Sequence, residues 1–294
     1  MISILIPTYN YNVFPLVCNL HRQAEKLEID FEIRVYDDCS SLPISENENI
    51  NQLSNTSFTI LKKNIGRSAI RNLLAEEAKF FNLLFLDADT QIIKKDFLQN
   101  YVEEIPKKYQ IIYGGIRYQE VAPSKSEKLR WIYGIKREAL AVEERKKEPH
   151  LRFLTLNFLI HKTVFSQLKF NEEIPNLRHE DTLFALDAKK KNISVRHIDN
   201  PVIHLGLESS EVFLRKSRES VESLKLFVDQ GLIRPEETAL SAKALQLQKS
   251  KSAVVVRRFY KNFKTSMEKN LLSDKPSLYL FDVYRLGYYL SLYK

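Results

Sequence analysis

The sequence has very little cysteine, and this excludes two classes of protein. Its 294 residues include only Cys18 and Cys39. Two cysteines cannot form the disulfide framework of a small secreted protein, and their spacing does not match that of zinc ligands. We therefore expect both thiols to be reduced core residues of a cytoplasmic protein.

Long apolar runs are also missing. No stretch of about 18 consecutive apolar residues occurs, which predicts that the chain has no transmembrane helix. Residues 1–7 lack the basic start and the cleavage site of a signal peptide and fit a short buried strand instead. With seven glycines there is no low-complexity linker, and 44% hydrophobic composition suffices for one large domain, with or without an appendage.

Acidic residues are fewer than basic ones, which gives a formal net charge of +8. A basic surface favours anionic partners such as nucleotides, phosphates or membrane headgroups, but it does not choose among them. Nucleic-acid binding would need a basic stripe or a known binding module, and we find neither. We therefore expect no nucleic-acid partner.

The first two thirds of the chain alternate apolar strands with helices. The expected strands are residues 3–7, 31–36, 58–61, 83–86, 111–117 and 153–161. The expected helices are residues 14–27, 68–78 and 180–191, with a charged helical insertion at 124–147. This order predicts an α/β fold, a mostly parallel sheet flanked by helices over residues 1–206, with a helical C-terminal extension over 207–294.

Polar residues follow three of the expected strands: Thr8-Tyr9-Asn10, Asp37-Asp38 and Asp87-Ala88-Asp89. Ligands of open α/β sheets bind beyond the carboxyl ends of the strands, so we expect these groups to meet at one edge. Two carboxylates two residues apart can hold Mn²⁺ or Mg²⁺, which prefer oxygen ligands and share them with substrate phosphates. The alternative is a solvated aspartate pair at a strand end.

Two other segments fit the binding of a nucleotide. Asp38 can accept a hydrogen bond from a uracil imide or a ribose hydroxyl, although Asp37-Asp38-Cys39-Ser40 is also typical of a simple turn. Asn64-Ile65-Gly66 opens a helix on which Arg67 and Arg71 share one face, which suits a diphosphate. The alternative for this segment is the start of an ordinary surface helix.

A third acidic group precedes the helix at 180–191. Glu180 or Asp181 can act as a general base near an acceptor hydroxyl, and either can equally serve as an acidic cap of that helix. His204 follows an apolar strand, where a lone histidine is more often structural.

Taken together, these residues resemble the family 2 glycosyltransferases with the GT-A fold. The resemblance lies in residues 3–10, 35–40, 64–72, 85–89 and 157–183, in that order, within residues 1–206. The family usually has glycine in place of Cys39.

The resemblance implies a metal-dependent, inverting transfer of a sugar from a nucleotide-sugar to a hydroxyl of a glycan or lipid-linked acceptor. The expected donor is a UDP-sugar. The expected role is the synthesis of cell-surface polysaccharide or glycoconjugate. Asp181 would be the catalytic base, and Glu180 would orient the acceptor or the base. The metal ligands would be Asp87, Asp89 and His204. The donor would be bound by Pro7, Thr8, Tyr9, Asn10, Asp37, Asp38, Asn64, Gly66, Arg67, Arg71, Asp87 and Ala88.

The C-terminal extension has no counterpart in the shared part of that family. Residues 251–294 interleave basic and aromatic side chains, which fits either a peripheral contact with the inner face of a membrane or a helix packed on its own protein. Two other functions stay open. One is a nucleotide-sugar-binding module without transfer activity, against which Glu180 and Asp181 argue. The other is a nucleotidyltransferase, which the absence of a glycine-rich loop after the first strand disfavours.

Overall fold

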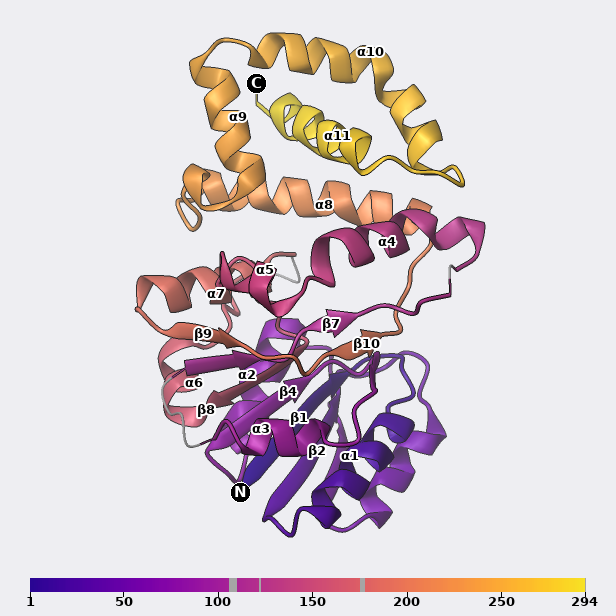
Figure 1. The fold of residues 1–294 in the computed structure, drawn as a ribbon, viewed down its shortest axis with the longest axis vertical. Coiled ribbons are helices and arrows are strands. Elements are labelled where there is room, and N and C mark those ends of the chain that lie inside the picture. The colour runs from indigo at the N-terminus through magenta and orange to yellow at the C-terminus, as the bar shows by residue number, and fades with distance from the viewer. Residues whose placement is uncertain (106–109, 122, 175–177, 294) are drawn as a thin grey trace. The chain divides into compact units, whose positions relative to one another are not determined.

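The structure is a computed structural model that describes residues 1–105, 110–121, 123–174 and 178–293 (Figure 1). The chain divides into two compact units. Unit 1 consists of Met1–Tyr118, Ala139–Asn176 and Glu180–Gly206. Unit 2 consists of Gln119–Glu138, Leu177–His179 and Leu207–Lys294, so the charged insertion is divided between the two units. A domain boundary at residue 206 stays a prediction.

Unit 1 contains a seven-stranded sheet in the order β3-β2-β1-β4-β8-β6-β9. The strands are β1 (Ile2–Thr8), β2 (Phe31–Asp37), β3 (Thr56–Ile60), β4 (Asn82–Leu86), β6 (Gln110–Tyr113), β8 (Asn157–His161) and β9 (Ser194–His197). Strands β3, β2, β1 and β4 run parallel to one another, β8 is antiparallel to both β4 and β6, and β9 is parallel to β6. The expected α/β fold with a mostly parallel sheet is therefore confirmed.

Helices flank this sheet. Those of unit 1 are α1 (Phe14–Lys26), α2 (Arg67–Glu77), α3 (Phe97–Val102), α5 (Val142–Lys146), α6 (Lys162–Leu168) and α7 (Glu180–Lys190), with the 3-10 helix η1 (Ser45–Gln52). Residues of α2, α6 and α7 form one apolar cluster with residues from one face of the sheet. Phe158 lies in this cluster, and its ring stacks on that of Phe85 at a centroid distance of 4.9 Å. Because both faces of the central strands are buried, β4 reads as a continuous apolar run.

A second sheet of three strands, β5 (Thr90–Ile92), β10 (Val202–His204) and β7 (Ile116–Arg117), corrects the expected strand at 111–117. That stretch is two strands, because Gly114 and Gly115 interrupt it and Gly115 has a φ of 102°. The side chain of Asn157 donates hydrogen bonds to the carbonyls of Gly115 and Asn200, both at 3.0 Å. The chain therefore leaves the main sheet at Tyr113 and pairs with β10 instead. The expected strand at 153–161 is also shorter, since it begins at Asn157.

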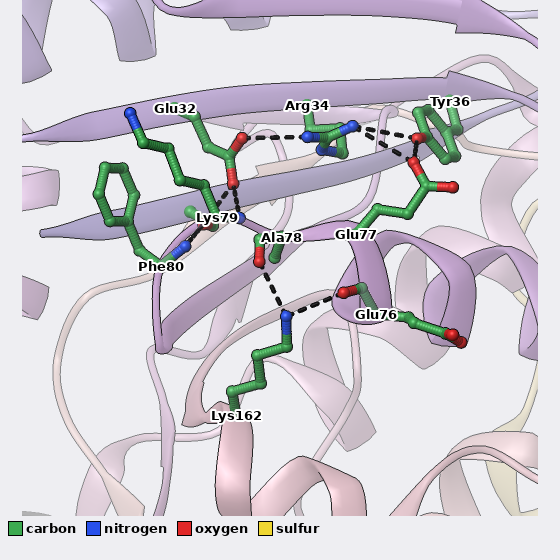
Figure 2. A network of polar contacts seen from close by, with 10 residues as sticks. Glu32, Arg34, Tyr36, Glu76, Glu77, Ala78, Lys79, Phe80 and Lys162 are labelled. Carbon is green, nitrogen blue, oxygen red and sulfur yellow. Dashed lines mark hydrogen bonds and ion pairs between the residues drawn. The ribbon is translucent and has the colours of Figure 1, made fainter.

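A polar network fixes the C-terminal end of α2 on the main sheet (Figure 2). On β2, Arg34 donates to Glu32 at 3.3 Å and to the hydroxyl of Tyr36 at 3.1 Å. Tyr36 in turn donates to Glu77 in the last turn of α2. Lys162 donates to two backbone carbonyls at the end of this helix, at 2.9 and 2.8 Å. These carbonyls have no partner inside the helix, so the lysine caps it and holds α2 in place.

Unit 2 is helical. It contains α4 (Lys128–Tyr133), α8 (Ser210–Asp229), α9 (Ala239–Lys249), α10 (Ala253–Leu271) and α11 (Leu278–Ser291). It also contains the 3-10 helices η2 (Lys125–Glu127) and η4 (Pro235–Glu237) and the π-helix η3 (Gly134–Glu138). Residues of α4, α8, α10 and α11 share one core, in which Gly287 lets α11 approach Tyr260 of α10 closely. Tyr133 packs on Phe213 and Phe281 in this core. None of the helices in the described part of the chain has both the length and the apolar character that crossing a membrane requires.

Candidate active site

The carboxyl ends of β2, β1 and β4 lie together at one edge of the main sheet, because these strands are parallel neighbours. Thr8 at the end of β1 is in register with Asp37 at the end of β2, and the half-buried Pro7 precedes it. Asp87-Ala88-Asp89 follows β4 directly. The structure thus brings together the three polar groups that were expected to meet, at the edge where open α/β sheets bind ligands.

Asn10 ties the loop after β1 to the loop after β2. Its backbone N–H donates to the hydroxyl of Ser40 at 2.7 Å, and its side-chain oxygen accepts from the N–H of Leu42 at 3.0 Å. Asn10 has a φ of 51°, a left-handed conformation that asparagine adopts more readily than most residues. The neighbouring Tyr9 is 49% exposed at this edge.

Asp38 holds the loop that leads into α2. Its two carboxylate oxygens accept from the backbone N–H groups of Ile65, at 2.7 Å, and Gly66, at 3.0 Å. The side chain of Asn64 donates back to the carbonyl of Asp38 at 3.0 Å. Asp37 accepts from the backbone N–H three residues further on, at 2.7 Å. Both aspartates are buried and organise the loops at this edge, whatever else they bind.

Arg71 of α2 is a buried cation beside Asp87. Its side chain is 7% exposed, and its guanidinium donates to the carboxylate of Asp87 at 2.6 Å. It also lies over the ring of Phe170, 5.6 Å from the centroid. Burial opposes the charge of Arg71, but Asp87 and further carboxylates outweigh it and raise the pKa of the guanidinium. Burial also raises the pKa of Asp87, helped by Asp89 and opposed by Arg71.

Glu180 and Asp181 form the first turn of α7. Glu180 pairs with Arg67 of α2 at 3.4 Å. Asp181 accepts from the backbone N–H of Thr182 at 2.7 Å and from its hydroxyl at 3.3 Å. Burial, and then the charge of Glu180, raise the pKa of Asp181 to about 6, against the hydrogen bonds and the charge of Arg71. A carboxyl with this pKa is ionised at neutral pH and is a stronger base than an exposed aspartate.

Asp89 in the turn before β5 and His204 at the end of β10 lie close together. His204 on β10 is paired with Thr90 on β5, immediately after Asp89. The Nε2 atom of His204 lies 3.3 Å from the carboxylate of Asp89, and Leu205 donates its backbone N–H to the carbonyl of Asp89 at 2.8 Å. The Nδ1 atom of His204 is buried and has no hydrogen-bond partner among the described residues.

These positions allow a direct test of the expected metal site. Asp89, directly before β5, supplies an oxygen and His204 on β10 supplies a nitrogen, which suits Mn²⁺ or Mg²⁺ if substrate phosphates and water complete the coordination. Asp87 instead faces Arg71. Within residues 1–105, 110–121, 123–174 and 178–293, no group of three or more His, Cys, Asp or Glu side chains is placed to hold a metal ion. The donor set therefore fits a cation held by two of the three expected ligands.

The sequence analysis missed two residues of this site. Gly206 allows the close approach of Asp89, because a Cβ atom there would lie 2.2 Å from its carboxylate oxygen. A glycine two residues after a candidate ligand, in a chain with seven glycines, was the available signal. Phe170 supports the guanidinium of Arg71 from the apolar core. No local pattern marks Phe170, since its partner is remote in sequence.

A family model described as glycosyl transferase family 2 matches residues 3–169 of the chain, which is more than half of it. No curated protein sequence matches the chain.

Several solved structures of TarS from S. aureus are similar to this chain. The full TarS structure is 18% identical, with a TM-score of 0.49, and the match covers 97% of this chain and 54% of TarS. TarS 1-349 in complex with UDP-GlcNAc is 17% identical, with a TM-score of 0.49, and its complex with UDP is 17% identical, with a TM-score of 0.48. Each of these two matches covers 98% of this chain and 89% of the other. These scores leave the ligand of this chain open.

Proposed function

The chain belongs to glycosyl transferase family 2, and we propose that it is an inverting enzyme that moves a sugar from a nucleotide-sugar to a hydroxyl of a glycan or lipid-linked acceptor. The observation that carries this proposal is the pairing of two acidic motifs through one helix. Arg71 of α2 contacts Asp87, and Arg67, one turn earlier, contacts Glu180. These two contacts support a donor-side motif and an acceptor-side motif that serve one reacting centre.

We propose a UDP-sugar as the donor, bound at the edge formed by the ends of β1, β2 and β4. The exposed ring of Tyr9 is suited to stack on a base. Each carboxylate oxygen of Asp38 keeps a second acceptor position after binding the loop, which suits a uracil imide or a ribose hydroxyl. The exposed guanidinium of Arg67 at the N-terminus of α2 favours the diphosphate.

Asp89 and His204 are the residues that we propose to hold Mn²⁺ or Mg²⁺, with Asp87 contributing through water while Arg71 holds it. When bound, such a cation would neutralise the charge that develops on the diphosphate leaving group. Asp89 and His204 lie 3.3 Å apart before any cation is added, so they are already oriented toward one another.

Asp181 is the proposed catalytic base. It would take the proton of the acceptor hydroxyl while the oxygen attacks the anomeric carbon, opposite the leaving diphosphate. The charges of Glu180 and Arg71 act on this carboxylate in opposite directions, and Arg67 pairs with Glu180. We place the reaction in cell-surface polysaccharide or glycoconjugate synthesis.

A nucleotide-sugar-binding module without transfer activity is the second candidate. It is favoured because Asp37 and Asp38 accept hydrogen bonds from the loops after β2 and before α2. These contacts would organise the proposed donor site even if the protein catalysed no reaction. The presence of both Glu180 and Asp181 at the start of α7, with the pKa of Asp181 raised by burial and by Glu180, argues for transfer.

A donor-hydrolysis screen tests the proposal. The full chain would be incubated with UDP-, GDP- and dTDP-sugars, each with Mn²⁺ and with EDTA, and nucleoside diphosphate release would be measured. We expect turnover of a UDP-sugar that depends on added metal. Metal-independent turnover would remove Asp89 and His204 as a cation site, and the failure of every nucleotide-sugar to bind would reject the proposal.

A further inference from the structure

Unit 2 presents one face of α10 that no described element covers. The opposite face of this helix is buried in the core of the unit, through Ala253, Tyr260, Met267 and Leu271. The exposed face contains large apolar side chains: Val254 is 60% exposed, Val255 70%, Phe259 42% and Phe263 49%. The outer face of α10 thus exposes four large apolar side chains, next to the polar Asn262, Thr265 and Ser266.

The apolar residues of this face form a stripe along the helix. Val255, Phe259 and Phe263 follow one another at a spacing of four residues, so they lie on one side of α10. The rings of Phe259 and Phe263 lie 4.7 Å apart and contact each other. A pair of half-exposed phenylalanines in contact is a ready anchor for an apolar partner.

Exposed basic side chains share the outer half of the helix with these apolar residues. At a rotation of 100° per residue, Arg258 and Lys269 lie between Val255 and Val254, and Lys261 lies just beyond Val254. The only acidic residue of the helix, Glu268, is half-buried and pairs with Arg218 at 3.2 Å within unit 2. The outer surface of α10 therefore combines apolar anchors with uncompensated positive charge.

The structure also shows which aromatic residues of the C-terminal segment are buried within unit 2 and which are exposed. Tyr260, Phe281, Tyr284 and Tyr289 are buried in unit 2, so packing accounts for them. Among the aromatic residues of 251–293, Phe259, Phe263 and Tyr279 are exposed, whereas Tyr288 and Tyr293 are half-buried. Two of the three exposed residues lie on the outer face of α10.

We propose that the outer face of α10, formed by Val254, Val255, Arg258, Phe259, Lys261, Phe263 and Lys269, docks this protein on an anionic lipid surface. An interfacial helix lies in the plane of the membrane with its apolar side chains among the acyl chains and its cations at the headgroups. The arrangement of α10 matches this geometry, and its charge is complementary to acidic headgroups. The proposal does not depend on the transfer reaction.

Vesicle co-sedimentation of the full chain tests this surface. Vesicles of phosphatidylcholine alone would be compared with vesicles that also contain phosphatidylglycerol, at low and at physiological salt. We expect binding to the acidic vesicles that weakens with salt, and much weaker binding to the neutral ones. Equal partitioning into both would overturn the proposal.

Two variants separate the apolar and the electrostatic contributions. Phe259→Ser/Phe263→Ser removes the anchors and should lower partitioning by roughly tenfold or more, because each phenylalanine side chain buried in the interface contributes on the order of a severalfold change. Arg258→Glu/Lys261→Glu should lower it by at least roughly 25-fold, since each cation near an acidic surface contributes about a fivefold change.

Matched controls keep the test specific. Tyr279→Ser removes an aromatic ring that is 76% exposed on α11, and it should bind vesicles like the unmodified chain. Arg22→Glu/Lys26→Glu makes the same change of net charge on α1 and should have a small effect. If these controls lose binding as fully as the α10 variants, general charge or instability explains the result. Self-association or nucleic-acid binding that the α10 variants abolish, without vesicle binding, would assign this face to another partner and also overturn the proposal.

Discussion

Arg71 is a buried cation that interacts with acidic side chains from two segments far apart in the chain. It contacts Asp87 directly, and its charge also acts on Asp181. The ring of Phe170 covers its guanidinium on the core side. At the scale of single residues, the charge of this one arginine lowers the pKa of both Asp87 and Asp181, against the effect of burial.

Removal of this arginine should be costly. In Arg71→Met the carboxylate of Asp87 loses its buried partner, and we expect the free energy of unfolding to fall by about 2–4 kcal/mol. Arg67→Met is the control, because Arg67 is 57% exposed and its pair with Glu180 should contribute less than about 1 kcal/mol. Urea denaturation of both variants measures the difference. Equal losses would show that Arg71 does not stabilise the fold through Asp87.

The raised pKa of Asp181 predicts opposite pH effects on stability and on transfer. The carboxyl has a pKa near 3.8 when exposed and about 6 in the folded protein, so the folded state holds its proton more tightly. Its contribution to stability is therefore greatest below about pH 4 and declines as the pH rises to about 6. Transfer needs the carboxylate, so kcat/KM should fall below about pH 6.

Thermal unfolding at several pH values measures the first effect. Asp181→Asn has no such titration, so its stability relative to the unmodified chain should increase between about pH 4 and pH 6, to a gain on the order of 2 kcal/mol. A constant difference across this range would contradict the raised pKa.

The backbone conformation at Cys39 could be anticipated from the sequence, whereas the contacts of Asp38 could not. The backbone φ of Cys39 is 60°, in the left-handed region that favours glycine. The family that the chain resembles usually has glycine here, and Cys39 adopts the left-handed conformation that glycine adopts without strain. The loop-holding contacts of Asp38 could not be predicted, because they depend on the position of a loop that begins 26 residues later.

At the scale of elements, the main sheet was largely predictable and the small sheet was not. Strands β1 and β4 are mainly apolar runs, and β2 alternates apolar with charged residues. Polar residues end or directly follow all three strands, so their patterns predict where they lie in the chain. Strands β7 and β10 have two and three residues. Strands this short are stabilised by pairing with each other, which the sequence pattern does not show. The periodicity of apolar residues also does not reveal that Gly114 and Gly115 direct β7 away from β6.

The small sheet also gives a prediction about Gly206. A Cβ atom at this position would push the carboxylate of Asp89, which can rotate away at little cost in stability but then no longer faces His204. We expect Gly206→Ala to lower the affinity for Mn²⁺ by roughly 10–100-fold, as loss of ligand orientation does in other metal sites. Isothermal titration calorimetry with Mn²⁺ and UDP measures this change.

Gly231→Ala is the control for that substitution. No atom lies within 4 Å of a Cβ there, and its φ of 73° makes the cost one of backbone strain, about 1 kcal/mol. It should leave Mn²⁺ binding unaltered. If the two variants bind Mn²⁺ equally well, Gly206 does not orient the proposed ligand.

At the scale of the whole molecule, the chain combines an α/β unit that carries the site with a helical unit that carries a basic, apolar surface. The sequence pattern predicted both kinds of structure, because strands alternate with helices up to about residue 206 and only helical patterns follow. It could not predict that Gln119–Glu138 belongs with the helical unit, because an amphipathic segment does not indicate which core it will join. Tyr133 illustrates this, since its ring packs on residues from two much later helices.

The central claim, that Asp181 is the base of a nucleotide-sugar-dependent transferase, is tested most directly by comparing Asp181→Asn with the unmodified chain. Transfer of sugar from a UDP-sugar to an acceptor hydroxyl would be measured at neutral pH, together with the Kd for UDP. We predict that transfer falls by roughly 10²–10⁴-fold while the Kd for UDP stays within about twofold. Unchanged transfer by Asp181→Asn would contradict the account.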